Sequence, residues 1–220
     1  MTTIQQSQPE IYQGQFGEFT ITPGDRRGVI LYRSGLATAA LSFALGCLLV
    51  LWQGATSTVL TALTLLFAVF SLGLAISLVT IHIYLAPLHR LLQLFWVVGT
   101  LSASVLAWRY RDPLALFVYA HPLTLFGIGF TFAALTGIYF KEAFCFNRLE
   151  TKFLTPLVPL LLLGHLAGVL TPKIEQLLLA AWALLFVVFA ARKVVQPIPP
   201  DIGDKSVFAY LKQKRYAKAE

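Results

Sequence analysis

The distribution of charged residues constrains this chain more than any other feature. Asp, Glu, Lys and Arg are absent from five long blocks, which are residues 34–89, 91–108, 113–140, 153–172 and 176–191. A helix that crosses a bilayer needs about 20 consecutive, mostly apolar residues. The blocks supply six such lengths, because the first contains 56 residues and must turn once. The sequence therefore predicts an all-α, polytopic membrane protein with a bundle of about six transmembrane helices.

The ends of these helices are set by polar, glycine-containing and proline-containing breaks. We expect the helices near residues 31–52, 58–83, 91–108, 114–140, 153–171 and 174–191. The fourth segment is longer than one span and contains His121-Pro122. The residue before a proline is biased away from helix, so residues 114–120 either lie at the membrane interface or precede a kink. Pro156 and Pro159 are expected in the first turns of the fifth helix, where a missing N–H is tolerated.

The overall composition excludes a soluble domain of ordinary type. The chain of 220 residues is 57% hydrophobic and only 12% charged. An average soluble domain carries about 25% charged residues, and a short chain has too much surface to do with half of that.

The basic residues give the expected orientation. Fourteen of the 17 Lys and Arg residues fall on one side if six helices separate the loops, and three fall on the other. Positive charge collects on the cytoplasmic side of a membrane. We therefore expect both termini in the cytoplasm, with contacts to the bilayer and to anionic lipids at its inner face. The net charge of +7 reflects this topology, and we expect no nucleic-acid partner.

Three regions follow from this topology. Residues 1–28 form a cytoplasmic N-terminal segment, partly disordered, in which the pattern of residues 11–22 suggests a small hairpin around Gly17. Residues 29–195 form the six-helix transmembrane domain. Residues 196–220 begin with a proline-rich linker, after which Asp204 caps a short helix over residues 205–218. That helix is either a basic amphipathic helix on the inner leaflet or a solvated tail.

The sequence contains no pattern that indicates catalysis. Cys-x-x-Cys, His-Glu-x-x-His and Gly-x-Ser-x-Gly are all missing, and no Asp, Glu, Lys or Arg lies at membrane depth in a predicted span, since Arg33 and Glu175 stand at span ends. Proton-driven carriers usually hold a charged residue at membrane depth. We therefore expect a protein that is not an enzyme, has no catalytic residues, binds no metal and carries no resident cofactor.

Histidines and small residues provide weaker candidates. His121 and His165 are the only pair at depths that could match for haem or pigment binding, although His165 bonding to a neighbouring helix is the simpler interpretation. Gly164 and Gly168 form a Gly-x-x-x-Gly pattern, and Gly73 and Ser77 share this spacing. Small residues at this spacing allow helices to approach closely, so we interpret both pairs as helix-packing sites.

The densest mixture of functional groups lies between the fourth and fifth helices. It is expected in an inner loop and combines charged, aromatic and thiol side chains: Lys141, Glu142, Phe144, Cys145, Phe146, Asn147, Arg148 and Glu150. Aromatic residues and arginine are enriched in the energetically dominant parts of interfaces. This segment is therefore a candidate surface for docking a partner protein, and the alternative is a solvated connecting loop.

Two segments resemble a known family. Lys-Glu-Ala-Phe-Cys-Phe-Asn-Arg-Leu-Glu at 141–150 follows Gly-Ile-Tyr-Phe at 137–140, and Tyr-Gln-Gly-Gln-Phe-Gly-Glu-Phe stands at 12–19. Together they resemble a cyanobacterial and plastid family of uncharacterised multispan integral membrane proteins, known as a domain of unknown function. The resemblance covers about residues 11–195. It implies a plasma or thylakoid membrane location and supplies no activity.

The sequence thus favours a non-enzymatic accessory or assembly partner of a larger membrane complex, and the resemblance extends this to a photosynthetic one. One alternative is a carrier or channel for a small neutral solute. A second alternative is a pigment-binding or haem-binding membrane protein.

Overall fold

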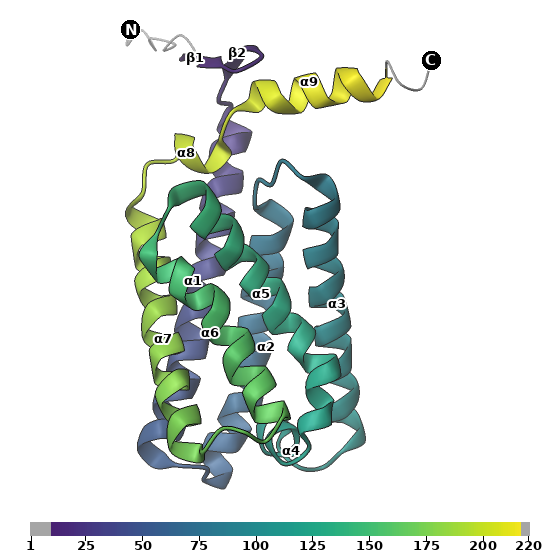
Figure 1. The fold of residues 1–220 in the computed structure, drawn as a ribbon, viewed down its shortest axis with the longest axis vertical. Helices are drawn as coiled ribbons and strands as arrows, with labels where there is room; N and C mark the ends of the chain where they lie inside the picture. Colours follow the sequence, from purple (N-terminus) through teal and green to yellow (C-terminus); the bar gives the residue numbers. More distant parts are fainter. Residues whose placement is uncertain (1–9, 217–220) are drawn as a thin grey trace, which may run out of the picture.

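A computed structural model gives the fold and describes residues 10–216. Among these residues, six helical segments are long and apolar enough to cross a membrane. They are α1 (Pro23–Gln53), α2 (Ser57–Thr80), α3 (Ala86–Arg109), α5 (Leu125–Phe146) with the preceding short turn η1 (Pro122–Thr124), α6 (Leu149–Leu166) and α7 (Pro172–Val195). They run side by side as one bundle (Figure 1). The predicted all-α polytopic bundle is therefore confirmed.

Aromatic side chains fill the middle of the bundle. α1 packs against α2 and α7, while α5 packs against α3 and α6. The ring of Trp182 on α7 lies 4.4 Å from that of Phe43 on α1 and 5.3 Å from that of Phe132 on α5, measured between centroids. Trp182 is buried, and its indole N–H donates to the hydroxyl of Tyr139 at 3.2 Å. These contacts join α1, α5 and α7 at one level.

The closest helix approach lies between α1 and α2. A Cβ placed on Gly35 would lie 2.5 Å from the carbonyl oxygen of Gly73, which is closer than any real contact. One turn further along α2, the hydroxyl of Ser77 donates to the carbonyl of Tyr32 at 3.0 Å. The structure therefore places Gly73 and Ser77 against α1, where only small residues fit.

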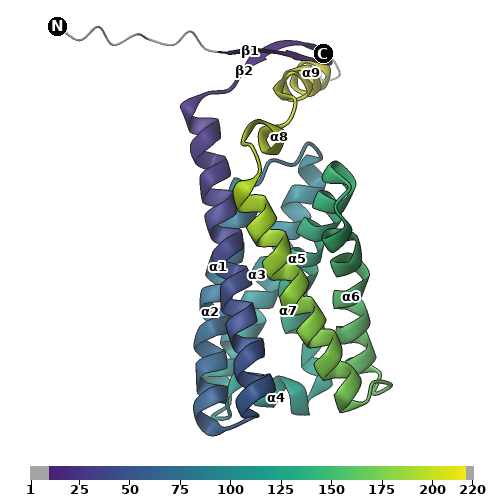
Figure 2. The same cartoon turned by 90° about the vertical axis from the view of Figure 1, so that its left-hand side faces the viewer.

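The fourth predicted helix is broken at His121-Pro122. Its first part is the separate short helix α4 (Leu114–Ala120), and η1 connects it to α5. α4 lies across the end of the bundle, roughly perpendicular to the spanning helices (Figure 2). Residues 114–120 thus form a separate helix across the end of the bundle, which is the arrangement expected for a segment along the membrane interface. They are not a kinked extension of the span.

Two helices begin earlier than the apolar pattern predicted. α1 starts at Pro23 and not near residue 31, because Thr22 and Asp25 form a reciprocal capping box. α6 starts at Leu149 and not near residue 153, so Pro156 and Pro159 lie inside the helix and the prediction that they occupy its first turns is wrong. The physical reason is common to both. Charge-free length reports membrane depth, whereas a helix can continue past the apolar region through charged residues.

The segments outside the spans form a small assembly at one end of the bundle. β1 (Ile11–Gly14) and β2 (Gly17–Thr20) pair as an antiparallel hairpin. The hairpin contacts α9 (Lys205–Tyr216), where the rings of Phe16 and Tyr210 stack with centroids 4.0 Å apart. The hairpin and α9 therefore lie together at the same end of the bundle (Figures 1 and 2). The expected disorder at the N-terminus falls mainly on residues 1–9, and the expected helix end at Lys218 also lies outside the described residues.

The hairpin and the C-terminal helix are joined through Asp204. Its carboxylate accepts from the backbone N–H of Gln15 at 2.6 Å and from the backbone N–H of Ser206 at 2.9 Å. α9 thus begins at the capping residue that the sequence indicated. The short helix α8 (Pro199–Ile202) lies between α7 and α9.

Candidate functional site

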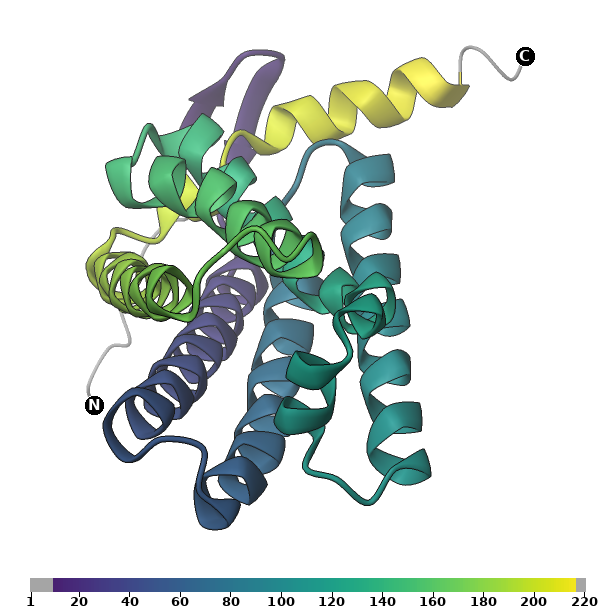
Figure 3. The same cartoon turned by 60° about the horizontal axis from the view of Figure 1, so that its bottom comes forward.

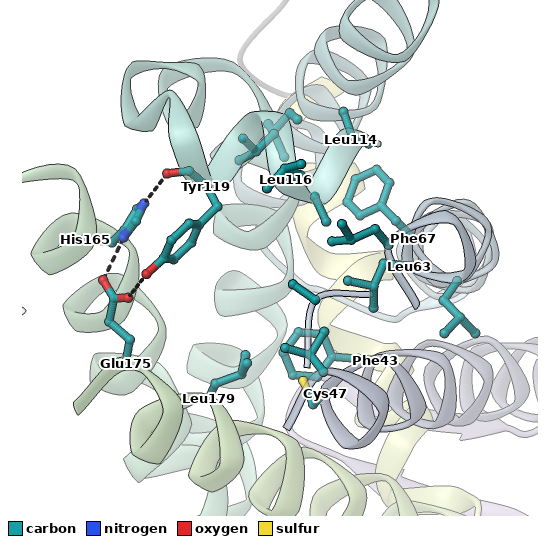
Figure 4. Close-up of a pocket in the computed structure, with 18 of the residues that line it drawn as sticks. Phe43, Cys47, Leu63, Phe67, Leu114, Leu116, Tyr119, His165, Glu175 and Leu179 are labelled. Carbon is teal, nitrogen blue, oxygen red and sulfur yellow. Dashed lines mark hydrogen bonds and ion pairs between the residues drawn. The ribbon is translucent and has the colours of Figure 1, made fainter. Parts of the chain in front are cut away.

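An apolar cavity opens near the end of the bundle that is opposite the termini. Its volume is about 470 Å³, within the range of about 300–1,000 Å³ that is usual for ligand pockets. α7 crosses α1 near the end with the termini and diverges from it toward the opposite end (Figure 2), and residues of both helices line the cavity. Residues of α1, α2, α4, α5, α6 and α7 contribute to the wall, and Figure 4 labels ten of them: Phe43, Cys47, Leu63, Phe67, Leu114, Leu116, Tyr119, His165, Glu175 and Leu179.

The aromatic centre of the bundle forms the inner limit of this cavity. Phe43, Phe67 and Phe132 line it, and Phe43 and Phe132 also pack on Trp182. Leu114 and Leu116 come from α4, so this crosswise helix supplies part of the cavity wall (Figure 4). The end of the bundle at which α4 lies is turned forward in Figure 3. The break at His121-Pro122 is therefore what positions α4 as a wall of the cavity.

Three polar residues form a cluster on one side of the apolar space. The hydroxyl of Tyr119 donates to Oε2 of Glu175 at 2.9 Å, and Nδ1 of His165 lies 2.7 Å from Oε1 of the same carboxylate. Nε2 of His165 lies 3.3 Å from the carbonyl oxygen of Tyr119, and the two rings stack (Figure 4). The hydrogen bond to the carboxylate, together with burial, raises the pKa of Tyr119 above its ordinary value.

This cluster comes from three helices that are distant in sequence. Tyr119 lies on α4, His165 in the last turn of α6 and Glu175 in the first turn of α7. A carboxylate with two partners at the edge of an apolar space supplies one place where a ligand's polar group can form a hydrogen bond. Such a combination fixes the orientation of an amphipathic molecule.

The structure corrects the predicted depth of His165. The residue was expected inside the fifth span, but it lies one residue from the end of α6, beside the cavity. Both of its ring nitrogens have protein partners. His121 is exposed, and its Nδ1 lies 2.9 Å from the carbonyl oxygen of Phe117. A haem or pigment needs one free ring nitrogen from each histidine. Nε2 of His121 has no partner among the described residues, whereas His165 would have to give up one of its two protein contacts to act as a ligand.

The segment 141–150 is not the loop that the sequence predicted. Lys141 to Phe146 form the last turns of α5, Asn147 ends that helix with φ 53°, and α6 begins two residues later. Phe144 is 83% exposed, and Cys145 and Asn147 are also exposed. A left-handed residue allows α6 to start almost directly after α5.

Two acidic residues of this segment are buried, which excludes them from a docking surface. Glu142 is fully buried and pairs with Lys141 at 2.8 Å and with Lys193 at 2.5 Å. Glu150 is 5% exposed and pairs with Arg192 at 2.7 Å and with Arg148 at 3.6 Å. The prediction that the whole segment faces a partner is therefore wrong for these two side chains, because helix formation turns them into the bundle.

The aromatic residues of the segment also differ in their surroundings. Phe146 is half-buried, and the ammonium group of Lys193 lies 4.0 Å from the centroid of its ring. The guanidinium group of Arg148 lies 5.9 Å from the same ring and also bonds to the side chain of Gln196. Phe144, Cys145 and Asn147 remain as the exposed part of the proposed surface.

No pattern in the sequence indicated the buried ion pairs at this end. Lys193 contacts both Glu142 of α5 and Asp201 of α8, and Asp201 pairs with Arg33 of α1 at 2.7 Å. The guanidinium group of Arg33 also donates to the carbonyl of Gln196 at 2.6 Å. The expectation of a charge-free interior is therefore wrong at the end near the termini. The residues come from four elements, so spacing along the chain does not reveal them.

The Gly164-Gly168 pair has a role other than helix packing. Gly168 lies beyond α6 with φ 66°, and nothing lies within 4 Å of a Cβ built on it. The backbone N–H of Val169 donates to the carbonyl of Gly164 at 3.1 Å, as at helix ends with a left-handed glycine. The prediction that the pair packs against another helix is wrong, because the helix stops between its two members.

The six spanning helices, the small assembly at one end and the cavity at the other define a polytopic α-helical membrane protein. Residues 76–210, which are more than half of the chain, match the family model described as "Uncharacterized integral membrane protein (DUF2301)". The chain belongs to this family. Neither the comparison with curated proteins nor the comparison with solved structures gave a match. The match runs from the end of α2 into α9, so it includes the whole of the Tyr119–His165–Glu175 cluster.

Proposed function

We propose that this protein is a non-enzymatic membrane protein that binds one neutral amphipathic molecule in the cavity between α1, α2, α4 and α7. The observation that carries the proposal is an apolar space of about 470 Å³ with a single carboxylate-centred cluster at its side. The apolar part of the ligand would lie among Phe43, Leu63, Phe67 and Leu179. Its polar group would lie beside Glu175.

The lining of the cavity defines the class of ligand. Leucine and phenylalanine side chains offer no partner to a charge, and an unpaired charge in such a space is costly. The carboxylate of Glu175 accepts hydrogen bonds, so a hydroxyl or amide donor fits the polar side. A lipid alcohol or a related neutral lipid has both features. This class would reach the cavity from the bilayer without crossing water.

Transport of such a molecule is the second candidate function. The cavity lies toward the α4 end, whereas the ion pairs of Lys193 with Glu142 and Asp201 close the end near the termini. A binding space on one side and a closed contact on the other is the arrangement that a carrier shows in one of its states. A carrier for a small neutral solute would use the same cavity.

An accessory role in a larger membrane complex rests on a separate observation. Phe144 is 83% exposed near the end of α5 and stands next to the exposed Cys145. An exposed aromatic residue beside the headgroup region can anchor a partner. The resemblance would place such a complex, including a photosynthetic one, in the plasma or thylakoid membrane. This role and ligand binding are compatible, since the two sites lie at opposite ends of the bundle.

Mass spectrometry of the purified protein tests the ligand proposal. The protein is purified in a mild detergent, its lipids are extracted, and an absorption spectrum is recorded for any pigment. We expect a neutral lipid in a near-stoichiometric amount. Leu179→Trp should reduce this amount several-fold, because the larger ring fills the cavity, whereas Leu184→Trp should not, since Leu184 is on the same helix and 66% exposed.

The polar side of the site is tested with Glu175→Gln and Tyr119→Phe. Tyr119→Phe removes a hydroxyl, and Glu175→Gln replaces one acceptor oxygen with an amide N–H donor and removes the negative charge. Both leave the apolar space unchanged, so each should lower ligand retention less than Leu179→Trp does. Retention of the same lipid at the wild-type amount by Leu179→Trp would contradict the proposal. Loss of a co-purifying protein in Phe144→Ala, with the lipid retained, would support the accessory role.

A further inference from the structure

A second hollow lies at the other end of the molecule, between the start of α3 and the underside of α9. Its volume is about 380 Å³. The rings of Tyr84 and Phe208 lie against each other in its wall, tilted by 34° with centroids 4.8 Å apart, and Arg90 and Lys212 supply its charge. Within the part of the chain that the structure describes, no acidic side chain lines the hollow. It therefore presents two cations beside an aromatic wall.

The two cations are available to a ligand. Arg90 and Lys212 are exposed, and neither has an ion-pair partner among residues 10–216. The other polar residues of the hollow are already engaged, because His89 and Gln93 both bond to the carbonyl of Leu78 at the end of α2. Two unpaired cations across one hollow match a phosphate group in charge and in number of donors.

The surface below the hollow suits an acyl chain. α9 lies across the end of the bundle, roughly perpendicular to the spans (Figures 1 and 2). Leu94, Val97 and Leu101 follow Arg90 on α3 at spacings of four, seven and eleven residues, so they share its face of the helix. They are 55%, 40% and 60% exposed, respectively. An apolar stripe thus runs from the cationic hollow down the outside of α3.

We propose that this hollow binds the phosphate headgroup of an anionic phospholipid in the leaflet on the side of the termini. The phosphate contacts Arg90 and Lys212, and the acyl chains lie along Leu94, Val97 and Leu101. The lipid connects α9 to α3, because each helix supplies one of the two cations. Basic hollows between helices near a membrane surface recognise such headgroups through the same chemistry.

Native mass spectrometry of the detergent-purified protein tests this site. Wild type is titrated with dioleoyl phosphatidylglycerol and, separately, with dioleoyl phosphatidylcholine. Arg90→Gln/Lys212→Gln should weaken binding of the first phosphatidylglycerol about 25-fold, since each basic residue near an anionic headgroup contributes roughly a factor of five. Arg109→Gln/Arg111→Gln makes the same change of charge at the opposite end and should leave this binding unchanged.

Additional conditions distinguish a lipid site from a site for free phosphate and from a general effect of charge. Arg90→Lys/Lys212→Arg should retain binding, because this variant keeps both positive charges. Added salt should weaken binding to wild type, because it screens the attraction between these charges and the phosphate. Inorganic phosphate should not displace the lipid, since it lacks the acyl contacts. Equal binding of the two lipids, unchanged binding in the glutamine variant, or displacement by phosphate would each overturn the proposal.

Discussion

The ammonium group of Lys193 on α7 lies 2.5 Å from Oε2 of Glu142 on α5, and neither side chain is exposed. The hydroxyl of Tyr32 donates to the other carboxylate oxygen at 3.1 Å, and Lys193 also contacts Asp201 of α8. Moving two charges out of water is unfavourable, so such a pair persists only where its hydrogen bonds are satisfied. These contacts therefore fix α1, α5, α7 and α8 relative to one another.

Removing the cation of this pair should destabilise the protein strongly. Lys193→Met leaves the carboxylates of Glu142 and Asp201 without their shared partner, and breaking a buried pair in this way costs about 3–5 kcal/mol. The melting temperature of the detergent-purified protein measures the effect. Lys152→Met is the matched control, because Lys152 is exposed on α6 and should lose almost nothing. Equal melting temperatures for the two variants would show that the pair is not needed for stability.

The sequence predicted the bundle because charge-free length has a direct physical meaning. A block without Asp, Glu, Lys or Arg marks a membrane crossing, and the six expected spans correspond to six helices. The hairpin at β1 and β2 and the cap at Asp204 were also readable, since both depend on residues close in sequence. Helix ends such as Pro23 were missed, because capping continues a helix past the apolar region.

The cavity and the buried ion pairs could not be read from the sequence in the same way. Tyr119 and Glu175 are separated by 56 residues, and Lys193 and Glu142 by 51. Only the packing of α4 and α7 against the rest of the bundle brings these groups together. Membrane orientation alone accounted for positive charges such as Lys193, so their side chains were expected in water and not inside the bundle.

The contact between the hairpin and α9 should depend on Asp204. Hydrogen bonds from Ser206 and from the backbone N–H of Gln15 hold the pKa of this carboxyl below its ordinary value. A carboxyl with a lowered pKa stabilises the folded state above its unfolded pKa of about 3.9, and this stabilisation disappears as the pH falls through the folded pKa. Asp204→Ala should imitate that loss at neutral pH.

Hydrogen exchange of the α9 amides measures this effect. Exchange should be faster in Asp204→Ala than in wild type, while α5 and α7 keep their protection, because the side chain of Asp204 forms hydrogen bonds only with residues of the terminal assembly. Wild type transferred to strongly acidic buffer should change in the same direction. Glu18→Ala, in the same hairpin, is the control, since Glu18 bonds only to its neighbour Gln13. Equal protection of α9 in all three proteins would contradict the role of Asp204.

The effect of replacing Gly168 should depend on whether the new residue tolerates the backbone conformation, and not on the size of its side chain. Its φ of 66° is left-handed, and the space around a built Cβ is empty. Asparagine tolerates this conformation, whereas a β-branched residue does not. Gly168→Asn should therefore stay near the wild-type melting temperature, and Gly168→Val should lose about 1–2 kcal/mol. If Asn destabilised the protein as much as Val, the cause would be packing against a neighbour and not backbone strain.

The orientation of the bundle can be tested with a single exposed thiol. Cys145 is exposed at the end of α5 near the termini, and fourteen basic residues are expected on that side, which predicts the cytoplasm. In a Cys47→Ala background, a membrane-impermeant maleimide should leave Cys145 unlabelled in intact cells and label it after permeabilisation. Asp112→Cys in a protein lacking both native thiols lies in the connection between α3 and α4 and should be labelled in intact cells. Reporters fused after Glu220 should read as cytoplasmic. The reverse labelling pattern would invert the molecule in the membrane and place the α4 end, with its cavity, toward the cytoplasm.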